Sequence, residues 1–207
     1  MSLLECLVGL ALSLILVAPL IKNSGELIAK QIEYEKTQSL SAEADRALEL
    51  IGRSIRMAGY QHANSLSRTH QREQRVADFI QIQKHSGYQR SDAVMVKHEL
   101  SSGVDFDCIG NTLTPERTKN GLAQQGFLVD RQASAPKGKK VNGGSLICQS
   151  LDRQGRIQNT TLMNGVQYLS IEVLPGLAGK AFRVKLEMTD GGWIQREFER
   201  TFSTRNL

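Results

Sequence analysis

The sequence predicts an α+β fold, in which a long N-terminal helix packs on an antiparallel β-sheet domain. Three observations support this prediction. They are an almost unbroken apolar run at residues 3–21, an apolar stripe with helical spacing at residues 40–58, and seven strand-like runs after residue 78. Of the 207 residues, 40% are hydrophobic and 23% are charged, which is the composition of one globular domain with an appendage. We divide the chain into segments 1–24, 25–59 and 60–207.

Segment 1–24 is expected to be the transmembrane half of the helix. Residues 3–21 read LLECLVGLALSLILVAPLI. With the two residues before them they form a helix about 31 Å long, which matches the hydrocarbon core of a bilayer. The segment has neither the basic start nor the small-residue cleavage site of a secretory signal peptide. We therefore expect it to be retained and to anchor the chain in a membrane.

Glu5 is the one charged residue in this apolar run. An isolated carboxylate in hydrocarbon is costly, so we expect it to be paired. No Lys or Arg precedes Lys22, and the nearest positive charge is the α-amino group of Met1, about one helical turn away. We expect Glu5 of one subunit to pair with the amine of another when their helices bundle. Pro19 lacks a backbone N–H and is expected to kink the helix.

Segment 25–59 is expected to be the amphipathic half of the helix. Its apolar residues recur at helical spacings, which is typical of one buried face. They are Leu40, Ala44, Ala47, Leu48, Ile51, Ile55 and Ala58. Charged residues lie opposite, with Glu49 and Arg53 spaced for an i,i+4 ion pair. Gly59 is a suitable residue to end the helix, and we expect the stripe to cover a sheet.

Segment 60–207 is expected to be a periplasmic globular domain rich in β-strands. Residues 61–74 are polar and without periodicity, which predicts a loop. Seven later runs carry apolar residues, several of them alternating with polar ones. They are residues 79–83, 92–98, 126–129, 145–150, 167–173, 181–188 and 193–203. The sequence TDGG at 189–192 predicts a turn between the last two runs, which would form an antiparallel hairpin.

The chain has three cysteines. Cys108 and Cys148 both lie in segment 60–207, and an even pair in an exported domain is expected to form a disulfide. Cys6 lies in the apolar run, where a thiol packs as a small hydrophobe.

The N-terminus resembles that of type IV pilins and pseudopilins. The resemblance rests on MSLLE at residues 1–5 and on the apolar helix with Pro19 near its end. It implies a pilin-like fold and an N-terminus made by a prepilin peptidase, which cuts after a glycine, methylates the new first residue and leaves Glu at the fifth position. Met1 would then be the methylated first residue, and Glu5 would act in assembly.

The rest of the chain resembles the PilW-type minor pilins. The matching stretches are RALELIGRSIRMAGYQ at 46–61, SDAVMVKHE at 91–99, DCIGN at 107–111, SLICQ at 145–149, LMNGVQYLSIEV at 162–173 and FERTFSTRNL at 198–207. This family often has a cysteine just after its AGY-like motif, where this chain has QHA at 61–63. Any bridge that relatives make there is therefore missing here.

This resemblance implies a non-enzymatic, structural minor pilin that helps to initiate type IV pilus assembly in a tip complex. The implied partners are other minor pilins, the major pilin and a PilY-type tip adhesin. The implied location is the inner membrane, with the domain in the periplasm, and then the extracellular pilus fibre. A J-type minor pseudopilin of a type II secretion system shares this architecture and is the alternative.

Sequence patterns of catalysis are missing. The motifs G-x-S-x-G, H-E-x-x-H, G-x-x-x-x-G-K and C-x-x-C do not occur, so we expect no enzyme activity and no cofactor. The four histidines lack metal-ligand spacing, and we expect a surface role for them. Asp105 and Asp107 form a D-x-D, but two carboxylates do not make the cage of six to eight oxygens that calcium needs. We predict no metal site.

The positive charge lies in the C-terminal part, since residues 61–207 hold 20 Lys and Arg against 14 Asp and Glu. These charges are scattered without interleaved aromatic residues, so we expect a solvated surface. Lys137, Lys139 and Lys140 lie in the sequence APKGKKVNGG at 135–144, which predicts a loop with a small basic tip. Contact between this loop and DNA, as in a competence pilus, is a second alternative function.

Overall fold

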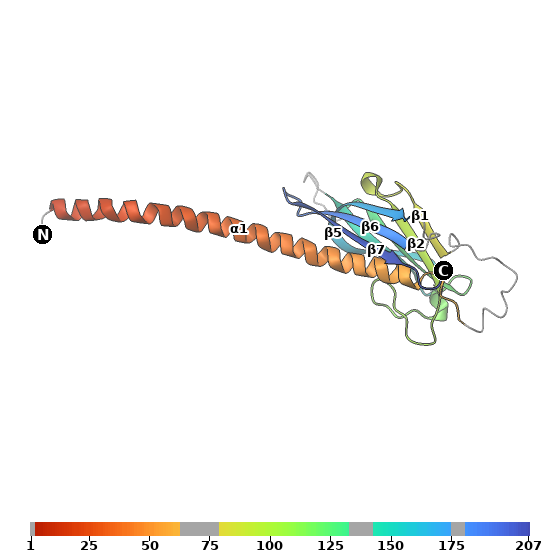
Figure 1. The fold of residues 1–207 in the computed structure, drawn as a ribbon. Coiled ribbons are helices and arrows are strands. Elements are labelled where there is room, and N and C mark those ends of the chain that lie inside the picture. Colours follow the sequence, from red (N-terminus) through yellow and green to blue (C-terminus); the bar gives the residue numbers. More distant parts are fainter. Residues whose placement is uncertain (1–2, 63–78, 133–142, 175–180) are drawn as a thin grey trace. The chain divides into compact units, whose positions relative to one another are not determined.

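A computed structural model describes residues 3–62, 79–132, 143–174 and 181–207 (Figure 1). Internal contacts divide the chain into two compact units, Met1–Ser39 and Leu40–Leu207. The first unit is helical, and the second combines the end of the same helix with a seven-stranded antiparallel sheet. The predicted α+β class, with one long N-terminal helix and an antiparallel sheet, is therefore correct.

Helix α1 (Leu3–Met57) has 55 residues and continues from the first unit into the second. In the first unit its apolar side chains are exposed, as at Leu3 and Ile21. The helix runs through position 19 without interruption, and the kink expected there stays a prediction. Among the residues that the structure describes, no helix is both long enough and apolar enough to cross a membrane.

In the second unit, α1 buries the predicted apolar stripe. Ala44, Ala47, Ile51 and Ile55 are fully buried and belong to the hydrophobic core of the domain. The ion pair on the charged side differs from the prediction, because Glu49 pairs with Arg56, two turns along the helix.

The end of the helix is as expected. Gly59 has a φ of 72°, the left-handed conformation in which glycine commonly ends helices. Its N–H donates to the carbonyl of Lys97 at 3.1 Å. This hydrogen bond ties the chain to the sheet directly after the helix.

The seven strands form one antiparallel sheet in which each strand pairs with its neighbours in the sequence. Short 3-10 helices η1 (Tyr88–Arg90) and η2 (Pro115–Arg117) lie in two of the connections. The strands are β1 (Ile80–Gln83), β2 (Ala93–Glu99), β3 (Leu122–Asp130), β4 (Gly144–Leu151), β5 (Ile157–Val173), β6 (Ala181–Thr189) and β7 (Gln195–Ser203).

All seven predicted runs overlap these strands, and the predicted hairpin of the last two is observed. Asp190 forms the turn, because its Oδ1 accepts hydrogen bonds from the N–H groups of Gly192 and Ile194. Two strands begin earlier than predicted, β3 at Leu122 and β5 at Ile157. Most of the loop expected at 61–74 lies outside the described residues, because the structure leaves out residues 63–78.

Strand β5 is the longest, with 17 residues, and its two halves have different neighbours. Residues 157–166 pair with β4, and residues 166–173 pair with β6. Gly165 lies at the changeover with a φ of 78°, and the register of both ladders shifts near it. Such shifts bend a strand, so β5 passes from one half of the sheet to the other.

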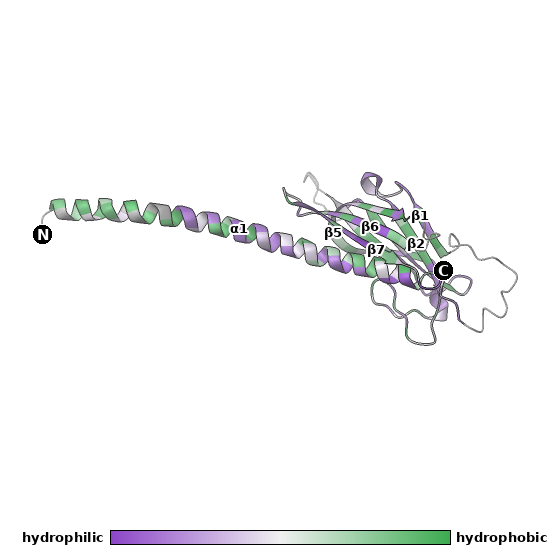
Figure 2. Cartoon of the chain, viewed as in Figure 1, coloured by the Kyte–Doolittle hydropathy of each residue, from purple (hydrophilic) through white to green (hydrophobic). Residues whose placement is uncertain are grey.

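The two faces of the sheet differ in polarity. Alternate residues such as Val94, Val96 and Val184 are buried on the face that packs on α1. On the outer face of β6 and β7, Arg183 pairs with Glu199 at 3.1 Å, and Lys185 pairs with Glu197 at 2.7 Å. Figure 2 shows this alternation as green and purple bands across the strands, and a green stretch along the start of α1.

Candidate functional site

The first unit exposes large apolar side chains on every side of its helix between residues 3 and 21. A helix that is apolar all round is normally covered by protein or lipid. Further along, Leu27, Ile28 and Ile32 are exposed too. We call this set the apolar helix surface; its residues are Leu3, Leu4, Leu7, Val8, Leu10, Leu12, Ile15, Val17, Leu20, Ile21, Leu27, Ile28 and Ile32.

The residues predicted to act in assembly lie at the beginning of this surface. Glu5 is part of α1, and Cys6 beside it is an exposed free thiol in the single chain. Met1 and the side chains of Glu5 and Pro19 lie outside the described residues. The pairing of Glu5 with an N-terminal amine therefore stays a prediction.

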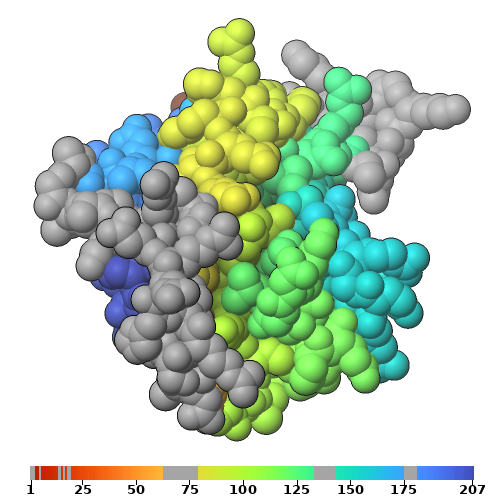
Figure 3. All heavy atoms as spheres, turned by 90° about the vertical axis from the view of Figure 1, so that its right-hand side faces the viewer, coloured from red at the N-terminus to blue at the C-terminus, as the bar shows by residue number. Residues whose placement is uncertain are grey.

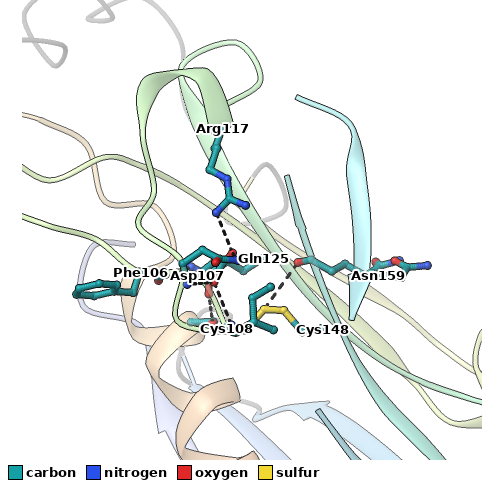
Figure 4. The surroundings of a disulfide bond; sticks show 11 residues. Phe106, Asp107, Cys108, Arg117, Gln125, Cys148 and Asn159 are labelled. Atoms are coloured by element: carbon teal, nitrogen blue, oxygen red, sulfur yellow. Dashed lines mark hydrogen bonds and ion pairs between the residues drawn. A yellow bond between two sulfur atoms is a disulfide. The ribbon is translucent and has the colours of Figure 1, made fainter. Parts of the chain in front are cut away.

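In the second unit, Cys108 and Cys148 form a disulfide, the pair that the sequence analysis expects (Figure 4). Cys148 lies in the middle of β4, and Cys108 lies in the connection between β2 and β3. Their Cα atoms are 6.1 Å apart, and both residues are buried. The bond holds the 100–121 connection, which we call the bonded loop, against the sheet.

Asp107 organises the bonded loop from within. Its side chain is fully buried, and Oδ1 accepts hydrogen bonds from the N–H groups of Ile109 and Asn111 at 3.0 and 2.8 Å. Arg117 donates to Oδ2 at 3.3 Å, so the buried charge has a cationic partner (Figure 4). This pattern is an Asx turn reinforced by an ion pair.

The two carboxylates of the D-x-D do not converge. Asp105 accepts hydrogen bonds from the N–H and the hydroxyl of Ser101 at 2.6 and 2.8 Å, whereas Asp107 is engaged within its own turn. Among the described residues, no three His, Cys, Asp or Glu side chains are grouped to hold a metal ion. Both aspartates serve the conformation of the bonded loop.

Gln125 of β3 connects three elements beneath the bonded loop. Its Oε1 accepts a hydrogen bond from the Ser54 hydroxyl of α1 at 2.8 Å, and its Nε2 donates to the carbonyl of Phe106 at 3.2 Å. Both polar ends of this buried amide are therefore satisfied. On the outside, the bonded loop borders the β4–β5 turn, since an added Cβ at Gly155 would lie 3.5 Å from the carbonyl of Thr118. Figure 3 shows the two as adjoining green and cyan surfaces.

His98 is a buried residue for which the sequence analysis expects a surface role. The residue is 1% exposed, and burial is the main cause that lowers its pKa. Its position in the alternating run could have indicated this, because His98 lies on the same face of β2 as Val94 and Val96.

Asp92 is a second residue that the sequence analysis does not identify. Residues 168–173 of β5 pair with β6 on one side only, because β4 pairs with β5 only as far as residue 166. Asp92 covers the other edge of this part of β5. Oδ2 of Asp92 accepts hydrogen bonds from Ile171 N and Lys84 Nζ, both at 2.8 Å, and Oδ1 accepts from His85 N at 3.1 Å. The Asp92 N–H donates to the carbonyl of Leu169 at 2.7 Å. The carboxylate thus takes the place of a strand at this edge.

The charge of Asp92 is stable despite its burial. Burial alone would raise the pKa of this carboxyl. The hydrogen bonds from Lys84, Ile171 and His85, together with the positive charge of Lys84, outweigh that effect and lower the pKa below its usual range.

The lysines of the predicted basic tip, Lys137, Lys139 and Lys140, lie outside the described residues. Of the sites predicted from the sequence, the structure therefore describes the apolar helix surface and the bonded loop. No protein-family model matches the chain, and no curated protein and no solved structure matches it significantly.

Proposed function

We propose that this chain is a structural subunit of a type IV pilus, a minor pilin that helps to initiate the fibre in a tip complex with other minor pilins. The observation that carries the proposal is the apolar helix surface. In the described part of the chain these side chains are about half to four-fifths exposed, whereas the domain that follows buries its own hydrophobic core. A subunit with one self-sufficient domain and one uncovered apolar helix is suited to bundle with other helices of the same kind.

The mechanism rests on what covers the helix. Before assembly, the proposal places the helix in the inner membrane, where lipid tails cover its apolar side chains. In the fibre, neighbouring helices replace the lipid, and tight packing supplies the contact energy. Pairing of Glu5 with the amine of a neighbour removes the cost of an isolated charge in an apolar environment, so it rewards assembly rather than insertion.

Replacing Glu5 with Leu tests this mechanism. We expect Glu5→Leu to leave membrane insertion unchanged or improved, and to lower fibre incorporation, because only assembly uses the charge pair. Glu26→Leu is the matched control, since it removes a carboxylate from an exposed position of the same helix beyond the apolar run. Quantitative immunoblots of sheared fibres and of washed membranes measure the two steps. Incorporation of Glu5→Leu at the native level, or the same loss in Glu26→Leu, would contradict the pairing role.

The tip position is tested separately. Deletion of the gene should reduce the number of fibres and leave the remaining fibres normal in width, because an initiating complex affects how often assembly starts. Labelled subunit should appear at fibre ends in electron micrographs. Label spread along the shaft at the abundance of the major pilin would contradict initiation at the tip.

The membrane stage has its own test. Membranes washed with alkaline carbonate should retain the chain before assembly, and protease should reach its domain only from the periplasmic side. Release of the full chain by the wash would exclude this stage.

A further inference from the structure

A small cavity lies in the second unit where the end of α1, the bonded loop and strands β2 and β3 meet. Residues of all four elements line it, namely Arg53, Met57, His98, Asp105, Phe106 and Gln125. It offers about 10 Å³ to the centre of a water molecule, which is enough for one water. The cavity therefore joins the helix, the loop and the sheet around one buried histidine.

The ring of His98 is fixed in one orientation by its backbone contact. Nδ1 lies 2.8 Å from the carbonyl of Glu99, and a carbonyl only accepts, so we assign the proton of the neutral ring to Nδ1. Nε2 then presents a lone pair, and it has no hydrogen-bond partner among the described residues. A water in the cavity can donate to this nitrogen, whereas a protonated Nε2 would need an acceptor instead.

We propose that His98 is an acid-sensitive latch: the neutral ring fits between the end of α1, the bonded loop and the sheet, and its protonation releases the bonded loop from the end of α1. The inference does not rest on the proposed function. Protonation places a second positive charge beside Arg53 of α1, in a space with room for a single water. More water must then reach the ring to hydrate the new charge. The part of the bonded loop that lines the cavity yields first, because it lies ahead of the disulfide at Cys108 and its residues Asp105 and Phe106 are partly exposed.

The groups around His98 shift its pKa in opposite directions. Burial has the largest effect and lowers the pKa of His98; Arg53 also lowers it, while the Glu99 carbonyl and Asp105 of the bonded loop raise it. Asp105 already accepts two hydrogen bonds from Ser101, which limits its ability to turn toward the ring. Gln125 of β3 is neutral and is hydrogen-bonded through both its oxygen and its nitrogen. Lys97 and Glu99 extend from the opposite face of β2. The net effect holds the ring neutral in the folded chain.

The sign of the pH effect follows from this balance. The folded pKa of His98 lies below that of the unfolded chain, near 6.5, so the unfolded chain binds more protons as the pH falls below that value. Stability is lost from about pH 6.5 downward until the folded pKa is reached. At most, the ratio of folded to unfolded chain falls about tenfold for each pH unit.

The first experiment compares urea unfolding of the full chain in detergent micelles at pH 7.5 and pH 5.0. Wild type, His98→Gln and His85→Gln are measured, because His85 is exposed and gives a matched substitution. We expect the folded-to-unfolded ratio to fall several-fold more in wild type than in His98→Gln, and His85→Gln to follow wild type. Equal pH dependence in wild type and His98→Gln would overturn the proposal.

The second experiment needs only the wild-type chain and covers the case in which His98→Gln does not fold. NMR titration should give His98 an apparent pKa below 6.5, the value of the unfolded chain. Amide exchange at residues 101–107, corrected for intrinsic rates, should accelerate as His98 protonates, while amides of β6 remain protected. A His98 pKa at or above 6.5, or a rate of amide exchange in the loop that does not change as His98 titrates, would overturn the latch.

Discussion

The two parts of α1 share one backbone conformation and carry opposite surfaces. In the first unit Ile28 is 59% exposed, whereas Ile51 in the second unit is fully buried. The difference follows from the pattern of side chains: residues 3–21 are apolar on every side, while residues 40–57 are apolar on one face and charged on the other. Only a one-sided stripe can be completed by a sheet of the same chain. The described residues leave the apolar side chains of the first part exposed.

The glycines of the helix show the same contrast. An added Cβ at Gly25 would meet nothing within 4 Å, but at Gly52 it would collide with the ring of Phe202 from β7. In the second unit the missing side chain is what allows an aromatic ring to pack on the helix backbone.

The largest difference between the regions is expected when the disulfide is removed. Cys108→Ser with Cys148→Ser should lower the free energy of unfolding of the domain by about 4 kcal/mol, on the chain-entropy model for a separation of 40 residues. The helix of residues 3–39 should keep its helicity, because no disulfide constrains it. Urea unfolding followed by circular dichroism measures both, with Cys6→Ser as the control. Equal loss in the control would place the effect outside the disulfide.

A matched pair of isoleucines sharpens the comparison. Ile51→Ala should cost about 3 kcal/mol, because it leaves a cavity between the helix and the sheet. Ile28→Ala should change the unfolding free energy of the chain by less than about 0.5 kcal/mol, since that side chain is exposed. Both are measured by urea unfolding of the full chain in micelles. A large cost at Ile28 would mean that the first unit has internal cover after all.

Acid separates the regions through Asp92. Asp92→Asn should destabilise the domain by about 2 kcal/mol at pH 7, because the amide nitrogen that replaces one carboxylate oxygen cannot accept the hydrogen bonds made to that oxygen, either from His85 N or from Ile171 N and Lys84 Nζ. The lowered pKa means that this contribution is fully present above the unfolded value, near 3.8, and is lost as the pH falls through the lower folded value. The gap between wild type and Asp92→Asn should therefore close below about pH 3.8. Unfolding curves across pH 2–7 check this, and a constant gap would contradict it.

The smallest expected effects come from the glycine pair. Gly25→Ala should raise helicity and stabilise the helix by up to about 1 kcal/mol, as alanine does at an open helical position. Gly52→Ala should instead destabilise the domain by about 1–2 kcal/mol, because the ring of Phe202 must move. Opposite signs, measured by circular dichroism and urea unfolding, would support the division of α1. Equal gains at both positions would contradict the packing of Phe202 on the helix.

Side-chain periodicity is the reason why much of this fold could be predicted. The stripe at residues 40–58 and the alternation in β2 and β6 each report burial on one face, and these elements lie where the sequence places them. The first half of β5 could not be found in this way. Residues such as Gln158 and Asn159 are exposed and are held by backbone pairing to β4, which leaves no alternation in the sequence.

The candidate sites also differ in whether a local sequence pattern predicts them. The cysteine pair can be predicted because few partners are available, and the apolar helix surface can be predicted from composition. The role of Asp92 depends on residues nearly 80 positions away in β5, and no local pattern encodes such a contact. His98 shows the limit of residue type as a guide, because its polarity favours the surface whereas its position in the alternating strand places it on the buried face.

The sequential order of the sheet has a consequence for how the domain acquires its structure. Each strand finds its partner next to it along the chain, so most pairings form by closing short loops, which favours rapid folding. During synthesis the N-terminal helix appears first, and each strand can then add to an edge already in place. The disulfide joins the β2–β3 connection to β4, so it can form before β6 and β7 arrive. The domain can therefore be built progressively from β1 to β7, with the covalent bond securing the first half while the second is still unfolded.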